Sequence, residues 1–232
     1  MTERPADNQP RDAVTTLSML AASTEVAAAV SARAIFVYAE SVLDPGGLRK
    51  MVGRGIEVIV AVRDDAVGRQ VETLGFRTIQ VPDVALTRMS QVKTAAVIAF
   101  SQRLLDTGDS VVFLVGPVRG LVDTMLVVRI GEEWEMFRTT DQPRLTEHVK
   151  RVVFERTLRI ALELAAEGRE GKPVGALFVV GDTRNVAQYS RQQILNPFKG
   201  YPESERNILD DRVRETVKMF ATLDGAFIVK GN

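Results

Sequence analysis

Two short glycine-containing segments carry the residue types and spacing that could support chemistry in this chain. The first runs from Gly116 to Gly120, follows an apolar run typical of a buried strand, and contains Arg119. Backbone amides beside glycines, together with one guanidinium group, could hold a phosphate. A glycine-rich connection with a solvated arginine has the same pattern, and we favour that structural interpretation.

The second segment is the tetrapeptide Leu223-Asp224-Gly225-Ala226, which joins a helical pattern to an apolar strand-like run. An Asp-Gly pair is a common turn signal, because both residues tolerate turn conformations. The tetrapeptide alone therefore predicts a turn and nothing more.

Several other kinds of site find little support in the sequence. The chain has one histidine, His148, and no cysteine, which removes His-rich and thiolate metal sites, disulfides and cysteine nucleophiles. Neither a P-loop nor a Gly-x-Gly-x-x-Gly run follows any predicted strand. A serine triad has weak support, and Trp134 with the scattered aromatic residues forms no ladder for stacking single-stranded nucleic acid.

The composition is that of an ordinary globular protein, with 45% hydrophobic and 26% charged residues among 232. Thirty basic residues balance thirty acidic ones, so we expect no general attraction to nucleic acid or to anionic membranes. The stretch Met1–Asp12 is polar and lacks the apolar core of a signal peptide, and Thr94–Phe100 is too short to span a bilayer. We predict a cytoplasmic protein with a disordered tail at residues 1–12.

Short β-branched runs alternate with helical patterns through the first half, which predicts a layered α/β domain with a parallel sheet over residues 13–141. Strands are expected at Ala34–Tyr38, Ile56–Val62, Phe76–Val81, Ser110–Val115 and Thr124–Ile130. Helices are expected at Leu48–Gly53, from Arg63–Asp65 to about Leu74, and at Leu86–Leu105. The segment Asp141-Gln142-Pro143 is the predicted domain boundary.

The second half, residues 144–232, is predicted to be another α/β unit. Helices are expected at Leu145–Glu167 and from Asp210 or Asp211 through a face of Val213, Val217, Phe220 and Leu223. A central strand is expected at Gly175–Gly181, a possible edge strand at Thr183–Gln188, a turn-rich loop at Asn196–Pro202 and a last strand at Ala226–Val229.

Three segments in this order resemble the diadenylate cyclase domain, most closely its archaeal type. They are Gly-Ala-Leu-Phe-Val-Val-Gly-Asp (Gly175–Asp182), Asn-Pro-Phe-Lys-Gly-Tyr (Asn196–Tyr201) and Leu-Asp-Gly-Ala-Phe-Ile-Val (Leu223–Val229). The first half, through Asp109–Gly131, resembles the C-terminal α/β domain of pyruvate kinase, which archaeal cyclases carry ahead of the catalytic domain. The two likenesses together span nearly everything from Ala13 to Asn232.

The resemblance implies an enzyme that condenses two ATP molecules into cyclic di-AMP with release of pyrophosphate. It assigns Asp224 as the catalytic residue and as a ligand of Mg²⁺ or Mn²⁺, and Gly225 and Ala226 as nucleotide-binding residues. A carboxylate there would hold the ion and help the ribose 3′-hydroxyl lose its proton. Two sites must meet face to face, so self-association into a catalytic dimer is implied, with no membrane or nucleic-acid partner.

The sequence departs from the family pattern at one point. The family's Arg-His-Arg motif, which binds the triphosphate, lies downstream of Asp-Gly-Ala, and this sequence reaches Asn232 without it. We therefore expect an incomplete cyclase domain that is inactive as a 232-residue chain, because a lost phosphate clamp costs orders of magnitude in rate. The alternative is a non-catalytic ligand-binding or regulatory α/β protein.

Overall fold

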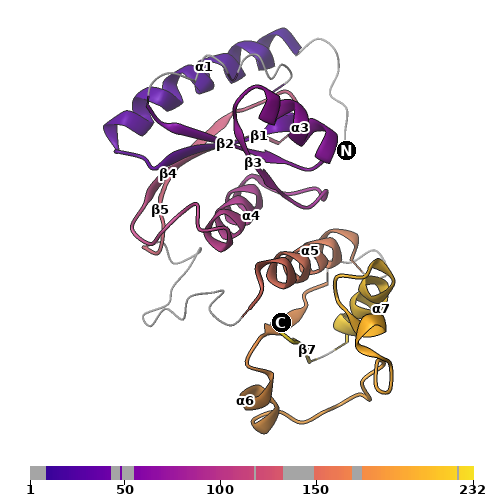
Figure 1. Cartoon of the computed structure of the whole chain (residues 1–232). Coiled ribbons are helices and arrows are strands. Elements are labelled where there is room, and N and C mark those ends of the chain that lie inside the picture. Colours follow the sequence, from indigo (N-terminus) through magenta and orange to yellow (C-terminus); the bar gives the residue numbers. More distant parts are fainter. Residues whose placement is uncertain are drawn as a thin grey trace. The chain divides into compact units, whose positions relative to one another are not determined.

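The computed structural model describes residues 9–42, 48, 55–117, 119–132, 149–168, 174–223 and 225–232. The chain divides into two compact units, Met1–Asp141 and Gln142–Asn232, which are drawn together in Figure 1 and described separately below. No helix among the described residues combines the length and the apolar character that crossing a membrane requires.

The first unit contains a five-stranded sheet in the order β3-β2-β1-β4-β5. Its strands are β1 (Ala34–Tyr38), β2 (Glu57–Val62), β3 (Arg77–Gln80), β4 (Ser110–Val115) and β5 (Thr124–Arg129). The first four run parallel, with Phe36 of β1 opposite Ile59 on one side and Phe113 on the other, whereas β5 is antiparallel to β4. The predicted α/β class is confirmed and the strands lie within one residue of the predicted bounds, but the sheet is mixed and not wholly parallel because β5 is antiparallel.

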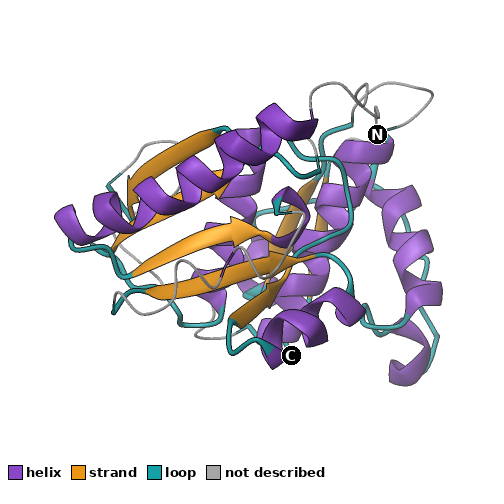
Figure 2. Ribbon diagram, turned by 90° about the horizontal axis from the view of Figure 1, so that it is seen from above, coloured by secondary structure: helices purple, strands orange, loops and turns teal. Residues whose placement is uncertain are grey.

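Helices cover both faces of this sheet, which explains why its strands are apolar throughout. The helices are α1 (Gln9–Ala29), α3 (Asp65–Thr73) and α4 (Arg88–Ser101). Figure 1 shows α1 and α3 on one side of the sheet and α4 on the other, and Figure 2, seen from above, shows the long helix α1 lying across the strands. Leu20 of α1 and Val71 of α3 join one buried cluster with Val37 of β1 and Val60 of β2. Strands buried on both faces need near-continuous β-branched and aromatic residues.

Two helix starts in this unit follow ordinary capping chemistry. The Asp64 side chain accepts hydrogen bonds from the backbone amides of Ala66 and Val67 at the start of α3. Thr87 accepts one from the amide of Ser90 at the start of α4. Each side chain satisfies amides that have no partner within the helix. α4 is shorter than predicted and ends at Ser101.

Two predictions for the first unit need comment. The disordered tail predicted at residues 1–12 is wrong for Gln9–Asp12, because α1 already begins at Gln9. Asp12 lies in the first turn of that helix, where a carboxylate is favourable beside the positive end of the helix dipole. Residues 1–8 lie outside the described residues, as does the helix predicted at Leu48–Gly53 except for Leu48, which is helical.

The second unit pairs two helices with a small sheet. Its elements are α5 (Arg151–Glu167), β6 (Leu177–Val180), α6 (Thr183–Gln188), a 3-10 turn (Glu203–Arg206), α7 (Asp211–Ala221) and β7 (Ala226–Val229). β6 and β7 form a parallel two-stranded sheet. Ile160 and Leu164 of α5 pack with Val213, Val217 and Ala221 of α7 to form the core.

Two predictions for this unit concern its helices and are corrected. Thr183–Gln188 is the helix α6 and not an edge strand, because Asp182 adopts a left-handed conformation (φ +42°) that turns the chain at once. The Asp182 carboxylate also accepts a hydrogen bond from Asn185 at 2.7 Å. α5 begins at Arg151, six residues later than predicted, and residues 145–148 lie outside the described residues.

The predicted central strand and the predicted face of α7 also differ in detail. Within the described residues β6 pairs with β7 alone, so β6 is not flanked on both sides. Leu223 lies beyond the end of α7 and is 38% exposed, whereas Ala221 takes the buried position in the core face. Leu223 is exposed because the chain has already left the helix and is turning toward β7.

Candidate functional site

The Asp-Gly-Ala segment lies between α7 and β7. Asp224 itself lies outside the described residues, and its neighbours are placed. Gly225 has φ +131°, a conformation that residues with a Cβ atom rarely adopt, and a Cβ there would lie 3.1 Å from Oε1 of Gln193. Ala226 begins β7 opposite Leu177 of β6. Gly225 and Ala226 are both exposed, so this backbone is open to a ligand.

Hydrogen bonds hold β7 along its length. Beyond its pairing with β6, the carbonyl of Val229 accepts a hydrogen bond from the amide of Gly181 at 3.0 Å. The carbonyl of Gly231 accepts one from the amide of Lys150 at 2.6 Å, just before α5 begins. The strand that follows Asp224 is therefore tied both to β6 and to the start of α5.

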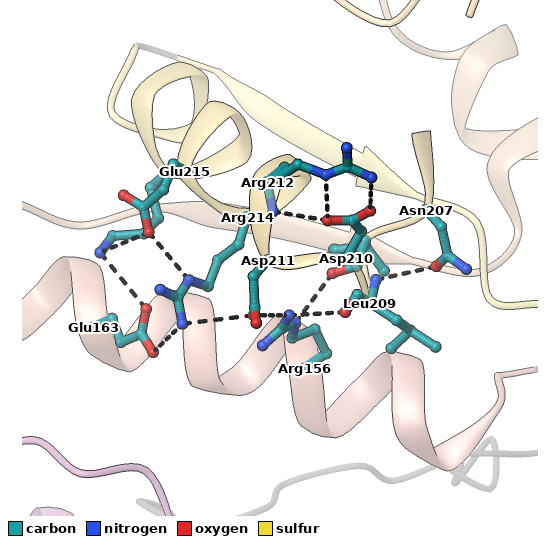
Figure 3. A network of polar contacts seen from close by, with 11 residues as sticks. Arg156, Glu163, Asn207, Leu209, Asp210, Asp211, Arg212, Arg214 and Glu215 are labelled. Atoms are coloured by element: carbon teal, nitrogen blue, oxygen red, sulfur yellow. Dashed lines mark hydrogen bonds and ion pairs between the residues drawn. The ribbon is translucent and has the colours of Figure 1, made fainter. Parts of the chain in front are cut away.

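A side chain on α5 anchors the start of α7. Arg156, whose side chain is 13% exposed, donates from Nε to the carbonyl of Ile208 at 3.1 Å. Its Nη2 donates to the carbonyl of Leu209 at 2.8 Å and to Oδ1 of Asp211 at 2.5 Å. Figure 3 shows Arg156 pointing from α5 to the first residues of α7. This one guanidinium satisfies two carbonyls and a carboxylate and fixes where α7 begins.

Further along the same interface, charged side chains of the two helices interleave. Arg214 and Lys218 of α7 both approach Glu163 of α5, at 3.7 and 3.6 Å, and Lys218 donates to Glu167 at 2.5 Å. Burial lowers the pKa of Lys218, but the hydrogen bond to Glu167 and the nearby carboxylates together raise it above its usual value. Lys218 is 9% exposed and is therefore a charged residue within the packed interface.

The consequence of these contacts is a fixed direction for α7. Arg156 holds its first residues and Lys218 holds its last turn to α5, while Val213 and Val217 pack between them. A site carried by the residues directly after a helix held in this way is positioned more accurately than one on a free loop.

Asp210 is the N-cap of α7, which resolves the choice between Asp210 and Asp211 left open by the sequence. Its carboxylate accepts from the backbone amide of Arg212 at 2.9 Å. The Arg212 side chain folds back and donates to the same carboxylate, and this hydrogen bond lowers the pKa of Asp210. Asp211 instead pairs with Arg156.

A groove of about 340 Å³ lies at the start of α7. It is lined by Pro197, Phe198, Tyr201, Glu205, Asp210, Arg212, Val213 and Thr216. The 11 residues of α7 span roughly 16 Å at 1.5 Å per residue. The groove lies at the start of α7, whereas the Asp-Gly-Ala segment follows the end of that helix.

In the first unit, the Gly116–Gly120 loop is shaped by its own packing. A Cβ at Gly116 would lie 1.7 Å from the carbonyl oxygen of Leu121, so only glycine fits there. The amide of Gly120 donates to the carbonyl of Glu40 at 2.8 Å, while Arg119 is exposed. These contacts agree with the structural interpretation of the glycines.

No group of three or more His, Asp or Glu side chains that could hold a metal ion occurs in the part of the chain that the structure describes. Asp224 falls outside that part, so the Mg²⁺ or Mn²⁺ ligand expected from the sequence stays a prediction.

Sequence reasoning did not identify the interface between α5 and α7, yet a signal was present. Glu163 and Glu167 are four residues apart, as are Arg214 and Lys218, so each pair lies on one face of its helix. Opposite charges repeated at this spacing beside two apolar stripes are a pattern that favours pairing of the two helices. The partner of Arg156 is 55 residues away, and sequence spacing gives no such signal for it.

Comparison with known proteins identifies the family of the first unit. Residues 15–139 match the family described as "Probable sensor domain DacZ_P". Because this match spans more than half of the chain, the chain belongs to that family.

Two archaeal diadenylate cyclases are similar to the chain. The protein from Methanocaldococcus jannaschii is 31% identical over 193 residues, covering 78% of this chain and 60% of the relative. The protein from Haloferax volcanii is 35% identical over 136 residues, covering 56% of this chain and 47% of the relative. The chain thus spans about half to 60% of the length of these relatives.

The first of these similarities reaches beyond the sensor domain. Coverage of 78% corresponds to about 181 of the 232 residues, and the first unit ends at Asp141, so at least about 40 matched residues lie in the second unit. A pyruvate kinase from Cryptosporidium parvum covers 49% of this chain and 22% of its own, with 17% identity and a TM-score of 0.39. That structural similarity is too low to carry an argument.

Proposed function

We propose that the second unit forms part of the active site of a diadenylate cyclase, which joins two ATP molecules into cyclic di-AMP and releases pyrophosphate. The observation that carries the proposal is the similarity to the M. jannaschii cyclase, which continues past the sensor domain into this unit. The helix-turn-strand arrangement around Gly225, with its exposed backbone, supports it.

The residues of the Asp-Gly-Ala segment have different roles in the proposed reaction. Asp224 would accept the proton of the ribose 3′-hydroxyl, and its carboxylate would be one ligand of a Mg²⁺ or Mn²⁺ ion, whose charge would offset that of the triphosphate. Gly225 and Ala226 present backbone without bulky side chains, so the nucleotide can lie against the start of β7. The α5–α7 contacts keep this turn in place while the reacting atoms align.

The reaction requires two ATP molecules in opposed orientations, so two copies of the unit must face each other with their Asp-Gly-Ala segments together. Self-association of the chain is therefore part of the proposal. ATP as substrate also supports a cytoplasmic location.

The test is an assay for cyclic di-AMP from ATP with Mg²⁺ or Mn²⁺, using the 232-residue chain and, in parallel, a version extended at its C-terminus by a diadenylate cyclase segment that carries the Arg-His-Arg motif. We expect product from the extended version and none from the 232-residue chain. Absence of product from the extended version with either ion would contradict the proposal. Formation of product by the 232-residue chain would show that the phosphate clamp comes from its own residues.

A second candidate function applies to the first unit, because its family is described as a probable sensor domain. On this view the unit binds a small ligand and regulates the second unit, in line with the ligand-binding alternative raised by the sequence. Binding of a small molecule to the chain without turnover would test it.

A further inference from the structure

The strand order of the first unit creates a place where ligands commonly bind. From β1 the chain passes to β2 and β3 on one side, and then returns through α4 to β4 on the other side of β1. The segments that follow β1 and β4 therefore leave the sheet in opposite directions. In open parallel sheets, the crevice outside the carboxyl ends of two such strands is the usual ligand site.

Charged side chains from four strand ends meet at this edge. Glu40 follows β1, Arg63 follows β2, Asp83 follows β3 and Arg119 follows β4. Nη2 of Arg63 lies 2.7 Å from Oε1 of Glu40, and Nη1 lies 3.9 Å from Oδ1 of Asp83. The Gly120 amide donates to the Glu40 carbonyl, which ties the loop carrying Arg119 to the same point.

A buried amide of α4 lies beside the same strand ends. Gln91 is 4% exposed, and its Nε2 donates to the carbonyl of Gly116 at 2.8 Å and to that of Leu86 at 3.3 Å. These two acceptors fix the orientation of the amide group, since a flip would set its oxygen against two carbonyls. The hydroxyl of Tyr38, at the end of β1, donates to the Gln91 carbonyl at 2.8 Å and places this residue beside the strand ends.

Two polar atoms at this place have no hydrogen-bond partner among the residues that the structure describes. They are Oε1 of Gln91, an acceptor, and Nε of Arg63, a donor, and both are buried. Leaving such atoms unsatisfied is costly, and native proteins rarely do so without a functional reason. Oε1 of Gln91 needs a hydrogen-bond donor, and Nε of Arg63 needs a hydrogen-bond acceptor. A molecule that satisfies both atoms must therefore carry a donor and an acceptor.

The charges select the class of molecule. The charges of the two guanidinium groups and the two carboxylates sum to zero. A polyanion such as a nucleotide would be attracted by the arginines but repelled by Glu40 and Asp83. Burial raises the pKa of Glu40 and outweighs the opposing effect of Arg63, although the Glu40 side chain is still 33% exposed. A positively charged ligand group would improve the solvation of Glu40, while an anionic group would pair with the arginines.

We propose that this edge of the sheet carries the sensory site of the first unit and that it binds a small zwitterion of the amino-acid class. The ligand's carboxylate pairs with Arg119 and Arg63, and its ammonium group donates to Glu40 and to Oε1 of Gln91. Because Glu40 follows β1 and Arg119 follows β4, one bound ligand would contact the segments after both strands.

The experiment measures the melting temperature of the 232-residue chain with each of the twenty L-amino acids and, separately, with inorganic phosphate. Any amino acid that raises the melting temperature is then titrated by calorimetry. We expect a saturable rise with at least one amino acid and no rise with phosphate. A rise with phosphate alone would overturn the zwitterion assignment, and no rise with any amino acid would overturn the site.

Three variants locate the binding. Arg119→Ala and Glu40→Gln should each weaken binding by about 10- to 100-fold, the usual effect of losing one charge-assisted hydrogen bond. Arg33→Ala is the matched control, because it removes an exposed arginine that precedes β1 and pairs with Glu57. It should change the affinity by less than about twofold. Equal weakening in all three variants, or unchanged binding in the first two, would contradict the assignment.

Discussion

The two sheets of this protein share parallel pairing but differ in how far they are covered. β1 is buried at all five positions and β4 at five of six, because helices pack on both faces. β6 has no buried residue and β7 has one. The first unit is thus stabilised mainly by its apolar sheet, whereas the second depends on the α5–α7 interface with its interleaved charges.

This difference suggests separate roles. A deeply buried sheet makes a rigid frame whose strand ends can hold a ligand site at a fixed edge. A small sheet with exposed backbone leaves β7 and the turn before it open to a substrate or a second copy of the chain. Three stability measurements test the comparison, and they are ordered by the size of the expected effect.

The largest effect is expected for a core phenylalanine of the first unit. Phe113 is fully buried and stacks on Phe36 with ring centroids 5.1 Å apart. Phe113→Ala should lower the free energy of unfolding by about 3–5 kcal/mol, the cost of the lost apolar burial and of the cavity. Phe178→Ala in β6 is the matched control and should cost less than half as much, since Phe178 is half-buried. Urea unfolding with hydrogen exchange on strand peptides measures both, and equal costs would contradict the comparison.

A smaller effect is expected at the charged interface of the second unit. Lys218→Met keeps the apolar stem but removes the ammonium group that faces Glu163, whose side chain is 15% exposed. The carboxylate then keeps Arg214 at 3.7 Å, and we expect a loss of about 1–3 kcal/mol. The double variant Lys218→Met/Glu163→Gln should recover part of that loss, because the buried Glu163 carboxylate is removed together with the ammonium group that it faced. A double variant less stable than the sum of the single changes would contradict the role of this pair.

The smallest effect is expected at an ion pair on the surface of the first unit. The hydrogen bond from Arg88 lowers the pKa of Asp123 below its ordinary value of 3.8. A lowered carboxyl pKa gives stability that is present above the ordinary value and is lost as the pH falls through the folded-state value. Asp123→Asn should therefore cost about 0.5–1 kcal/mol at pH 7 and nothing once the pH is well below 3.8. Thermal unfolding across that pH range measures it, and a difference that persists in acid would show that the ion pair is not its cause.

The first unit could be predicted more fully than the second, for a physical reason. β1, β2 and β4 are continuous β-branched runs that must be buried on both faces, so their pattern defined them closely. Thr183–Gln188 has no buried residue that constrains its pattern, and its weak alternation of apolar and polar residues favours an edge strand. The left-handed turn at Asp182, which depends on tertiary contacts, made it a helix.

The turn of the candidate site could be predicted from the sequence, but the contacts between α5 and α7 that support it could not. The Asp-Gly pair before an apolar run indicated the turn, and Gly225 has the backbone conformation that only glycine adopts readily. The supports of that turn are contacts between residues about 50 positions apart, such as Lys218 with Glu167. Contacts of this kind follow from the packing of α5 on α7 and leave little trace in local sequence.

The most direct test of the central claim is the effect of Asp224→Asn on cyclic di-AMP formation by the version of the chain extended through the Arg-His-Arg motif. This substitution keeps the turn preference but removes the carboxylate, so the rate should fall by about two to four orders of magnitude with the melting temperature nearly unchanged. Asp182→Asn is the matched control: it removes the same charge in the same unit, where asparagine also tolerates the left-handed conformation, and the rate should stay within a few-fold. A rate for Asp224→Asn equal to that of the control, or lost in proportion to stability, would contradict the assignment of Asp224.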